Sequence, residues 1–174
     1  MRQSKRKVGA YVLLGAIAAL VLVLDQVTKG LVRRHLPLNQ PYMPVDWLDP
    51  LFTFRHVQNT GAAFGLFPGG ATVFMGIAVV VVIGIIIYYA RLDRPALLLR
   101  AALGLQLGGS VGNLIDRLMH NGAVTDFVDL RWFPVFNVAD SAITIGTIIL
   151  ACYMLFEDRR APEPDSEKNP ALTA

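Results

Sequence analysis

The feature that most constrains this chain is a set of four apolar runs, each about as long as a bilayer is thick. They cover roughly residues 8–24, 71–90, 96–115 and 138–156. A helix that crosses a membrane needs about 20 consecutive, mostly apolar residues. The composition agrees, because 54% of the 174 residues are hydrophobic, whereas ordinary globular domains are about 45–50% apolar. The sequence therefore predicts an all-α integral membrane protein with four transmembrane helices.

The first run follows a basic stretch, as the apolar part of a secretory signal peptide does. It is longer than the roughly 7–15 residues of such a segment, and no small-residue cleavage site follows it. The run instead ends in the polar sequence Asp25-Gln26-Val27-Thr28-Lys29. We interpret residues 8–24 as an uncleaved membrane span.

The basic residues predict how the spans are oriented. Lys and Arg are enriched in cytoplasmic loops, and of the 16 in the chain most lie at the two ends and between the second and third spans. Lys29, Arg33 and Arg34 lie on the other side and oppose this bias. We expect both termini in the cytoplasm, with the protein crossing the membrane several times.

The segments between the spans predict the domain organisation. Residues 1–156 are expected to form one membrane domain, and residues 157–174, rich in Pro and charge, a disordered cytoplasmic tail. The two outer connections, about 31–70 and 116–136, contain strand-like stretches at Leu51–Val57 and Ala123–Leu130, in which β-branched and aromatic residues are frequent. We therefore expect a small extracytoplasmic β-rich platform over the bundle.

Several classes of protein and site are disfavoured. The formal charge of +3 does not indicate nucleic-acid binding, because the basic residues flank apolar runs and form no aromatic-interleaved stripe. Cys152 is the only cysteine, so disulfides are excluded, and a buried structural thiol is expected. His35, His56 and His120 lack ligand spacing, so no metal site is predicted.

Polar sequences cluster where the predicted spans meet the outer face. With four spans, five polar segments converge there: Asp25-Gln26-x-x-Lys29, Asn59-x-Gly61-x-x-Phe64-Gly65, Gly112-Asn113-x-x-Asp116-Arg117, Asp126-Phe127 and Phe136-Asn137-x-Ala139-Asp140. Ionisable groups inside a membrane are costly and usually face a bundle interior or a wet cavity. The clustering therefore predicts a functional site at this end.

Spacing places several of these side chains together. Asn113, Asp116 and Arg117 share one helix face at i, i+3 and i+4, as Asn137 and Asp140 do at i and i+3. Small residues allow close helix packing in membranes, and the third span carries them at Gly104, Gly108, Gly109 and Gly112. We expect this strip to bring the polar faces of the third and fourth spans together.

Each piece also has a structural interpretation. Asp25 and Lys29 could form an interfacial ion pair, Asp116 and Arg117 a helix-terminal charge pair, and Asn59 with Gly61 a turn. Asp129 is expected to be a solvated loop carboxylate. Asp140 could make a buried structural hydrogen bond.

The arrangement favours carboxylate chemistry. The sequence contains no H-E-x-x-H motif, and Ser110, although it lies in the G-x-S-x-G run of residues 108–112, has no evident general base beside it. Two aspartates held close together share one proton, so one can act as a base toward water and the other as an acid toward the leaving group. This chemistry suits a peptidase, in which the water attacks a peptide carbonyl. The main alternative is a small transporter with Asp126 or Asp140 as its cation or proton site, and a structural membrane subunit is another. Transporters usually place such a carboxylate near the midplane between inverted repeats, whereas here the acids crowd one edge and no repeat is visible.

The five ordered motifs resemble those of the lipoprotein signal peptidase (signal peptidase II) family, bacterial intramembrane aspartic peptidases, over about residues 8–156. The resemblance implies that Asp126 and Asp140 form the catalytic dyad. It implies supporting roles at the substrate site for Asn59, Gly61, Asn113, Arg117 and Asn137, and structural or positioning roles for Asp25, Lys29 and Asp116.

The resemblance also implies the reaction. Substrates of the family are prolipoproteins with a diacylglyceryl group on a cysteine, and the enzyme cuts just before that cysteine to release the signal peptide. Membrane lipids are expected neighbours, cyclic peptides such as globomycin are expected inhibitors, and neither a metal nor an organic cofactor is implied.

Overall fold

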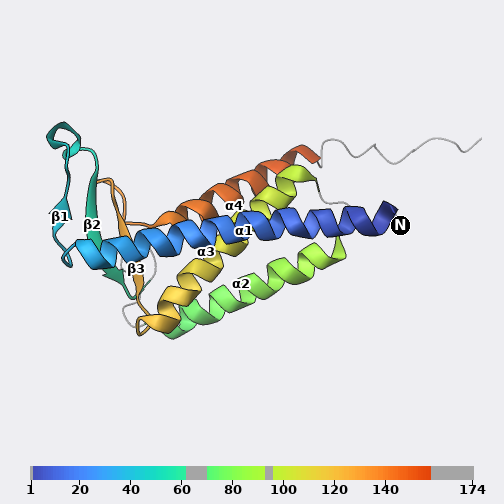
Figure 1. Ribbon diagram of the computed structural model, residues 1–174, viewed down its shortest axis with the longest axis horizontal. Coiled ribbons are helices and arrows are strands. Elements are labelled where there is room, and N and C mark those ends of the chain that lie inside the picture. Colours follow the sequence, from blue (N-terminus) through green and yellow to red (C-terminus); the bar gives the residue numbers. More distant parts are fainter. Residues whose placement is uncertain (1, 62–69, 93–95, 158–174) are drawn as a thin grey trace, which may run out of the picture.

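The computed structural model describes residues 2–61, 70–92 and 96–157. Within these ranges the helices run lengthwise side by side, and a small sheet caps one end of the bundle (Figure 1). The N-terminus and the end of the last helix lie at the opposite end. The chain thus separates an apolar bundle from a β-rich platform, as the sequence predicts.

The described helices are α1 (Arg2–His35), α2 (Ala71–Arg91), α3 (Leu97–Met119) and α4 (Val138–Glu157). Three segments in the described residues are long and apolar enough to cross a membrane: Tyr11–His35, Thr72–Arg91 and Val138–Phe156. Helix α1 differs from the prediction, because it continues well past Leu24 to His35. At about 1.5 Å per residue its 34 residues extend about 50 Å, so α1 passes through the bundle and reaches the sheet.

Helix α3 lies at the centre of the bundle and packs against each of the other three helices. Its glycines allow this close approach. An added Cβ at Gly108 would lie 2.6 Å from the backbone oxygen of Ala18 on α1, and one at Gly109 would lie 2.5 Å from that of Ala139 on α4. Gly104 and Gly112 also face α1, so the strip serves the packing of α1 more than the contact with α4 that the sequence suggested.

The platform is a three-stranded antiparallel sheet in the order β1-β2-β3. Its strands are β1 (Pro41–Tyr42), β2 (Thr53–Asn59) and β3 (Val124–Asp129), with a short 3-10 helix, η1, at Asp46–Leu48. The two strands predicted from β-branched and aromatic residues are confirmed, although β2 begins and ends two residues later than expected. The pairing places Asp126 opposite Val57 and Val124 opposite Asn59.

Two further predictions concern Cys152 and the C-terminal tail. Cys152 is exposed on α4 rather than buried, because it lies on a helix face that no other described element covers in the isolated chain. The predicted tail, from residue 158 onward, lies outside the described residues, and so do Phe64 and Gly65 of the second motif.

Candidate active site

A cavity of about 280 Å³ lies where the bundle meets the sheet. Its walls combine polar side chains from four elements with an apolar side formed by residues 133–136 and Ile143. Six of the predicted site residues line it: Asn59, Gly61, Asn113, Arg117, Asp126 and Asp140. The structure therefore brings both aspartates into one cavity.

Asp126 projects from β3 and is almost fully buried, with 2% of its surface exposed. Two side-chain amides donate to its carboxylate: Asn137 Nδ2 to Oδ1 at 2.6 Å and Asn59 Nδ2 to Oδ2 at 2.9 Å. Gly61 fixes the Asn59 amide in turn, since its backbone N–H donates to Asn59 Oδ1 at 3.0 Å. Burial, together with the charge of Asp140, raises the pKa of Asp126 to about 7 against the lowering effect of the two amides. Near neutral pH this carboxyl can thus hold or release a proton.

Asp140 lies in the first turn of α4 and is partly exposed to the cavity. Its Oδ1 accepts from Asn113 Nδ2 at 2.8 Å, and its Oδ2 accepts from the backbone N–H of Asn137 at 3.2 Å. The Asp140 backbone N–H donates back to Asn137 Oδ1 at 2.9 Å. This reciprocal pair is a capping-box arrangement, so the residue that caps α4 also contacts both aspartates.

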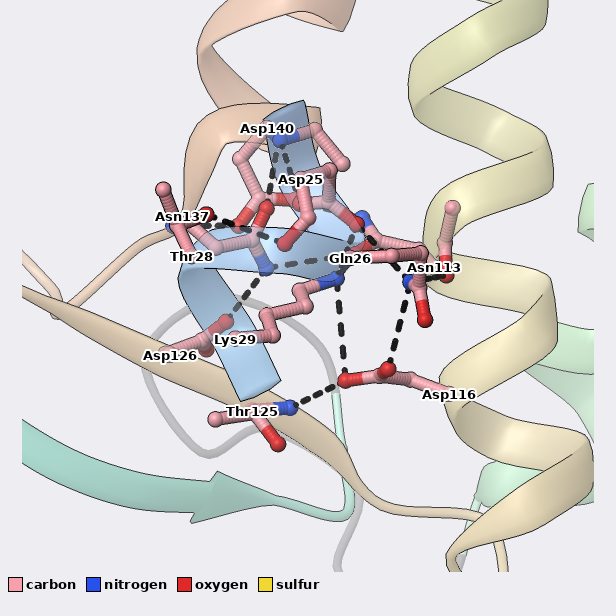
Figure 2. Close-up of polar contacts among 12 residues, drawn as sticks. Asp25, Gln26, Thr28, Lys29, Asn113, Asp116, Thr125, Asp126, Asn137 and Asp140 are labelled. Atoms are coloured by element: carbon pink, nitrogen blue, oxygen red, sulfur yellow. Dashed lines mark hydrogen bonds and ion pairs between the residues drawn. The ribbon is translucent and has the colours of Figure 1, made fainter. Parts of the chain in front are cut away.

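Lys29 sets the orientation of the amide that contacts Asp140 (Figure 2). Its ammonium is fully buried, 2.8 Å from Asp25 Oδ2, and donates to Asn113 Oδ1 at 2.9 Å. With the oxygen of Asn113 turned toward Lys29, its amide N–H points to Asp140. Asp25 also accepts the backbone N–H of Ala139 at 2.9 Å. The pair seen in the sequence as an interfacial ion pair is therefore a buried connection between α1, α3 and α4.

Asp116 is a second buried carboxylate beside this network. Lys29 Nζ lies 3.6 Å from its Oδ2, and the Arg33 guanidinium lies 3.3 Å from its Oδ1. The backbone N–H of Thr125 donates to its Oδ2 at 2.8 Å. Asp116 on α3 therefore forms ion pairs with α1 and accepts a hydrogen bond from β3.

Arg117 follows Asp116 on α3 and lines the cavity. Its guanidinium carbon lies 5.8 Å from the centre of the Phe74 ring on α2, a distance compatible with a cation–π contact. Within the described residues its buried Nε has no hydrogen-bond partner. A donor is therefore left available at the cavity wall.

Sequence reasoning missed some residues and misjudged another. Arg33 and Thr125 belong to the buried network, as does Gln26, which the sequence presents as a motif residue without a role at the site. Arg33 could have been recognised, because it lies four residues after Lys29 and eight after Asp25 on one helix face. The expectation of a solvated Asp129 was wrong: it is 3% exposed and pairs with Arg55 at 2.9 Å, because the register of β2 and β3 brings them together.

In the stretches that the structure describes, no group of three His, Cys, Asp or Glu residues has a metal-binding arrangement. His56 and His120 each direct Nδ1 to a backbone carbonyl, at 3.0 and 3.1 Å respectively. These two histidines therefore have local structural contacts.

Known proteins resemble this chain over most of its length. Residues 17–156 match the family model described as signal peptidase (SPase) II. The chain belongs to the signal peptidase II family. It is 48% identical over 141 residues to the lipoprotein signal peptidase of Moorella thermoacetica, covering 80% of this chain and 89% of the relative. It is 43% identical over 144 residues to that of Geobacillus kaustophilus, covering 80% and 91%.

Solved structures extend the match to the fold. A bacterial membrane enzyme determined at 2.3 Å resolution superposes with a TM-score of 0.78 at 29% identity, covering 87% of this chain and 93% of that one. A second, determined at 1.9 Å resolution, gives 0.71 at 30% identity, covering 80% and 90%. The chain is thus a peptidase of the signal peptidase II family and a multi-pass membrane protein.

Proposed function

We propose that this protein is an aspartic endopeptidase that removes signal peptides from prolipoproteins, cutting just before a cysteine that carries a diacylglyceryl group. The membership of the signal peptidase II family supports the substrate class. The observation that carries the mechanism is the placement of Asp126 and Asp140 on the wall of one cavity.

In this mechanism the dyad shares one proton. The ionised carboxylate takes a proton from a water molecule, and the water oxygen bonds to the carbonyl carbon of the scissile peptide. The protonated carboxyl stabilises the developing oxyanion by hydrogen bonding and then delivers a proton to the leaving nitrogen as the C–N bond breaks. The products are the signal peptide with a new carboxyl end and a lipoprotein that begins with the lipidated cysteine.

The surrounding residues have supporting roles. Asn59 and Asn137 hold Asp126, and Asn113 with the backbone of Asn137 holds Asp140. Arg117 has a donor free to meet a carbonyl oxygen of the substrate. Asp25, Lys29 and Asp116 form the buried network that positions these groups and make no contact with substrate.

We further propose that α3 is a fourth membrane span within a single domain of residues 1–156. It is less apolar than α2 and α4 because it lies among the other helices, and its buried face carries glycines, Ser110 and Asn113. Four spans place both termini on one side, which the distribution of basic residues assigns to the cytoplasm of a bacterial cell. Lys29 and Arg33, which opposed that assignment, have buried partners in the fold.

The substrate would reach the cavity from the side, between helices. A lipid-modified precursor is anchored in the membrane, and sideways access lets its acyl chains remain among lipids. The apolar flanks of the bundle, exposed in the isolated chain at residues such as Val80 and Leu155, would contact those lipids. A cyclic peptide such as globomycin would compete for the same cavity.

The function is tested with purified protein in lipid vesicles. A prolipoprotein with the diacylglyceryl group and the same precursor without it are incubated separately, and mass spectrometry locates the cleavage. We expect a product that begins with the lipidated cysteine, formed from the lipidated precursor alone and suppressed by globomycin. Equal cleavage of both precursors, or cleavage elsewhere, would contradict the proposal.

A further inference from the structure

Asp126, Asp140 and the amides that bind them lie on or next to four elements: α3, α4, β2 and β3. One face of α1 contacts three of these, α3, α4 and β3. Asp25 accepts the backbone N–H of Ala139 on α4, and Lys29 donates to Asn113 on α3. Arg33 completes the series, because its Nη1 donates to Thr125 Oγ1 on β3 at 2.9 Å. Residues 25, 29 and 33 recur every four positions and so project from one side of the helix.

The contact with Thr125 bears directly on Asp126, which follows it on β3. Consecutive side chains of a strand point to opposite faces, so a strand gripped at Thr125 presents Asp126 to the cavity. Thr125 is held twice, by Arg33 through its hydroxyl and by Asp116 through its backbone N–H at 2.8 Å. Arg33 also pairs with Asp116 at 3.3 Å, which closes a three-residue clamp (partly visible in Figure 2).

We propose that Arg33 is a positioning residue for Asp126: by clamping Thr125 and Asp116 it holds β3 against α1 and α3 and so sets the separation of the two aspartates. This inference rests on the proposed dyad mechanism. Arg33 is not among the residues that line the cavity, so it acts through the strand and does not touch substrate.

Replacing Arg33 leaves the buried Asp116 carboxylate with other partners, so we expect the variants to fold. The Arg33 side chain is 25% exposed, and Asp116 keeps the Thr125 N–H and the nearby Lys29 ammonium. The expected defect is a shift of the strand. Misplacement of a reacting group by about 1 Å can cost about a hundredfold in rate.

The test compares Arg33→Gln with Arg34→Gln, a matched control at the neighbouring exposed arginine. For each, kcat and KM are measured on the lipidated precursor as a function of pH. We expect Arg33→Gln to lower kcat by about tenfold to a hundredfold with KM little changed, Arg33→Lys to recover part of the loss, and Arg34→Gln to match wild type.

The pH profile separates positioning from simple loss of charge. Charged groups that face Asp126 are Asp140 on α4, Lys29 on α1 and Arg117 on α3. Burial and Asp140 raise the pKa of Asp126, so a loosened strand weakens both effects, and the alkaline limb of kcat moves to lower pH. Loss of a nearby positive charge alone would move it to higher pH.

Thr125→Val gives a second measurement that changes no charge and keeps the β-branched shape. We expect a smaller loss of kcat, the same direction of pH shift, and a double variant with Arg33→Gln that loses less than the product of the two effects. Wild-type kcat in Arg33→Gln, equal losses in Arg34→Gln, or a shift to higher pH would overturn the inference. Failure of the wild-type protein to cleave the precursor would instead overturn the proposed function.

Discussion

The two aspartates of the cavity are held in different ways. Asp140 lies in the first turn of α4, and two of the three hydrogen bonds described above for it are with Asn137, which caps the same helix. Asp126 lies on β3, and its partners come from other parts of the chain, including Asn59 on the neighbouring strand. The position of Asp140 therefore depends on the packing of a helix, whereas that of Asp126 depends on cross-strand and clamp contacts.

Because of this difference, we expect substitutions near the two aspartates to affect the stability of the fold and the catalytic rate in different ways. Changes that disturb α4 must disturb the bundle core, because α4 packs tightly on α3 and is capped from α1. Changes beside Asp126 affect a small sheet at the end of the bundle. We therefore expect defects near Asp140 to lower both stability and activity, and defects near Asp126 to alter activity and its pH dependence.

The largest effect is expected from Lys29→Met. The substitution removes the buried ammonium that pairs with Asp25, which caps α4, and leaves Asp25 and Asp116 without it. Breaking a buried pair by removing one partner costs about 3–5 kcal/mol. Thermal unfolding in detergent measures the loss, with Arg34→Met as the control. An unchanged midpoint would show that Lys29 is not part of the framework around Asp140.

A smaller effect on the same side is expected from Gly109→Ala. The new Cβ would lie 2.5 Å from the backbone oxygen of Ala139, the residue before Asp140, so α4 must move. Overpacking of this kind costs about 1–3 kcal/mol, and kcat should fall together with the unfolding midpoint. Gly84→Ala on α2 is the control, because its Cβ would meet nothing within 4 Å. A lower kcat with an unchanged unfolding midpoint would contradict the proposed difference between Asp140 and Asp126.

The smallest effect on stability is expected from Asn59→Ala, beside Asp126. The Asn59 hydrogen bond lowers the pKa of Asp126, so its removal raises that pKa and moves the alkaline limb of kcat to higher pH. The limb is expected to move by about one to two pH units, since a hydrogen bond to a charged group contributes about 1.5–3 kcal/mol and one pH unit corresponds to about 1.4 kcal/mol.

The control for this variant is Gln58→Ala, at the exposed neighbouring position of β2. Its pH profile and its unfolding midpoint should match those of wild type. A shift of the Asn59→Ala limb to lower pH would mean that Asn59 does not stabilise the ionised form of Asp126.

Much of the fold follows from local patterns. Apolar runs place the helices α2, α3 and α4 to within a few residues, and β-branched residues identify β2 and β3. The end of α1 could not be placed this way, because Asp25, Lys29 and Arg33 look like residues leaving a membrane. They are instead paired inside the protein, so the helix continues to the sheet.

The site follows from motif order and helix spacing, but its connections do not. The sequence predicts that Asn113 and Asp116 share a face; it does not say that Lys29 orients Asn113 or that Arg33 reaches Thr125. Those contacts join positions more than 80 residues apart. The burial of Asp129 was missed for the same reason, since its partner Arg55 lies on another strand.

The central claim is that Asp126 and Asp140 together perform the hydrolysis. Its most direct test is single-turnover cleavage of the lipidated precursor by Asp126→Asn, Asp140→Asn and the control Asp49→Asn, whose carboxylate is half exposed and pairs with Arg131 away from the cavity. We expect both cavity variants to lose about a thousandfold or more in rate, since each removes a proton-transfer group that contributes about 10²–10⁴-fold, while Asp49→Asn cleaves as wild type does. Cleavage at the wild-type rate by either cavity variant, with the protein folded, would contradict the account.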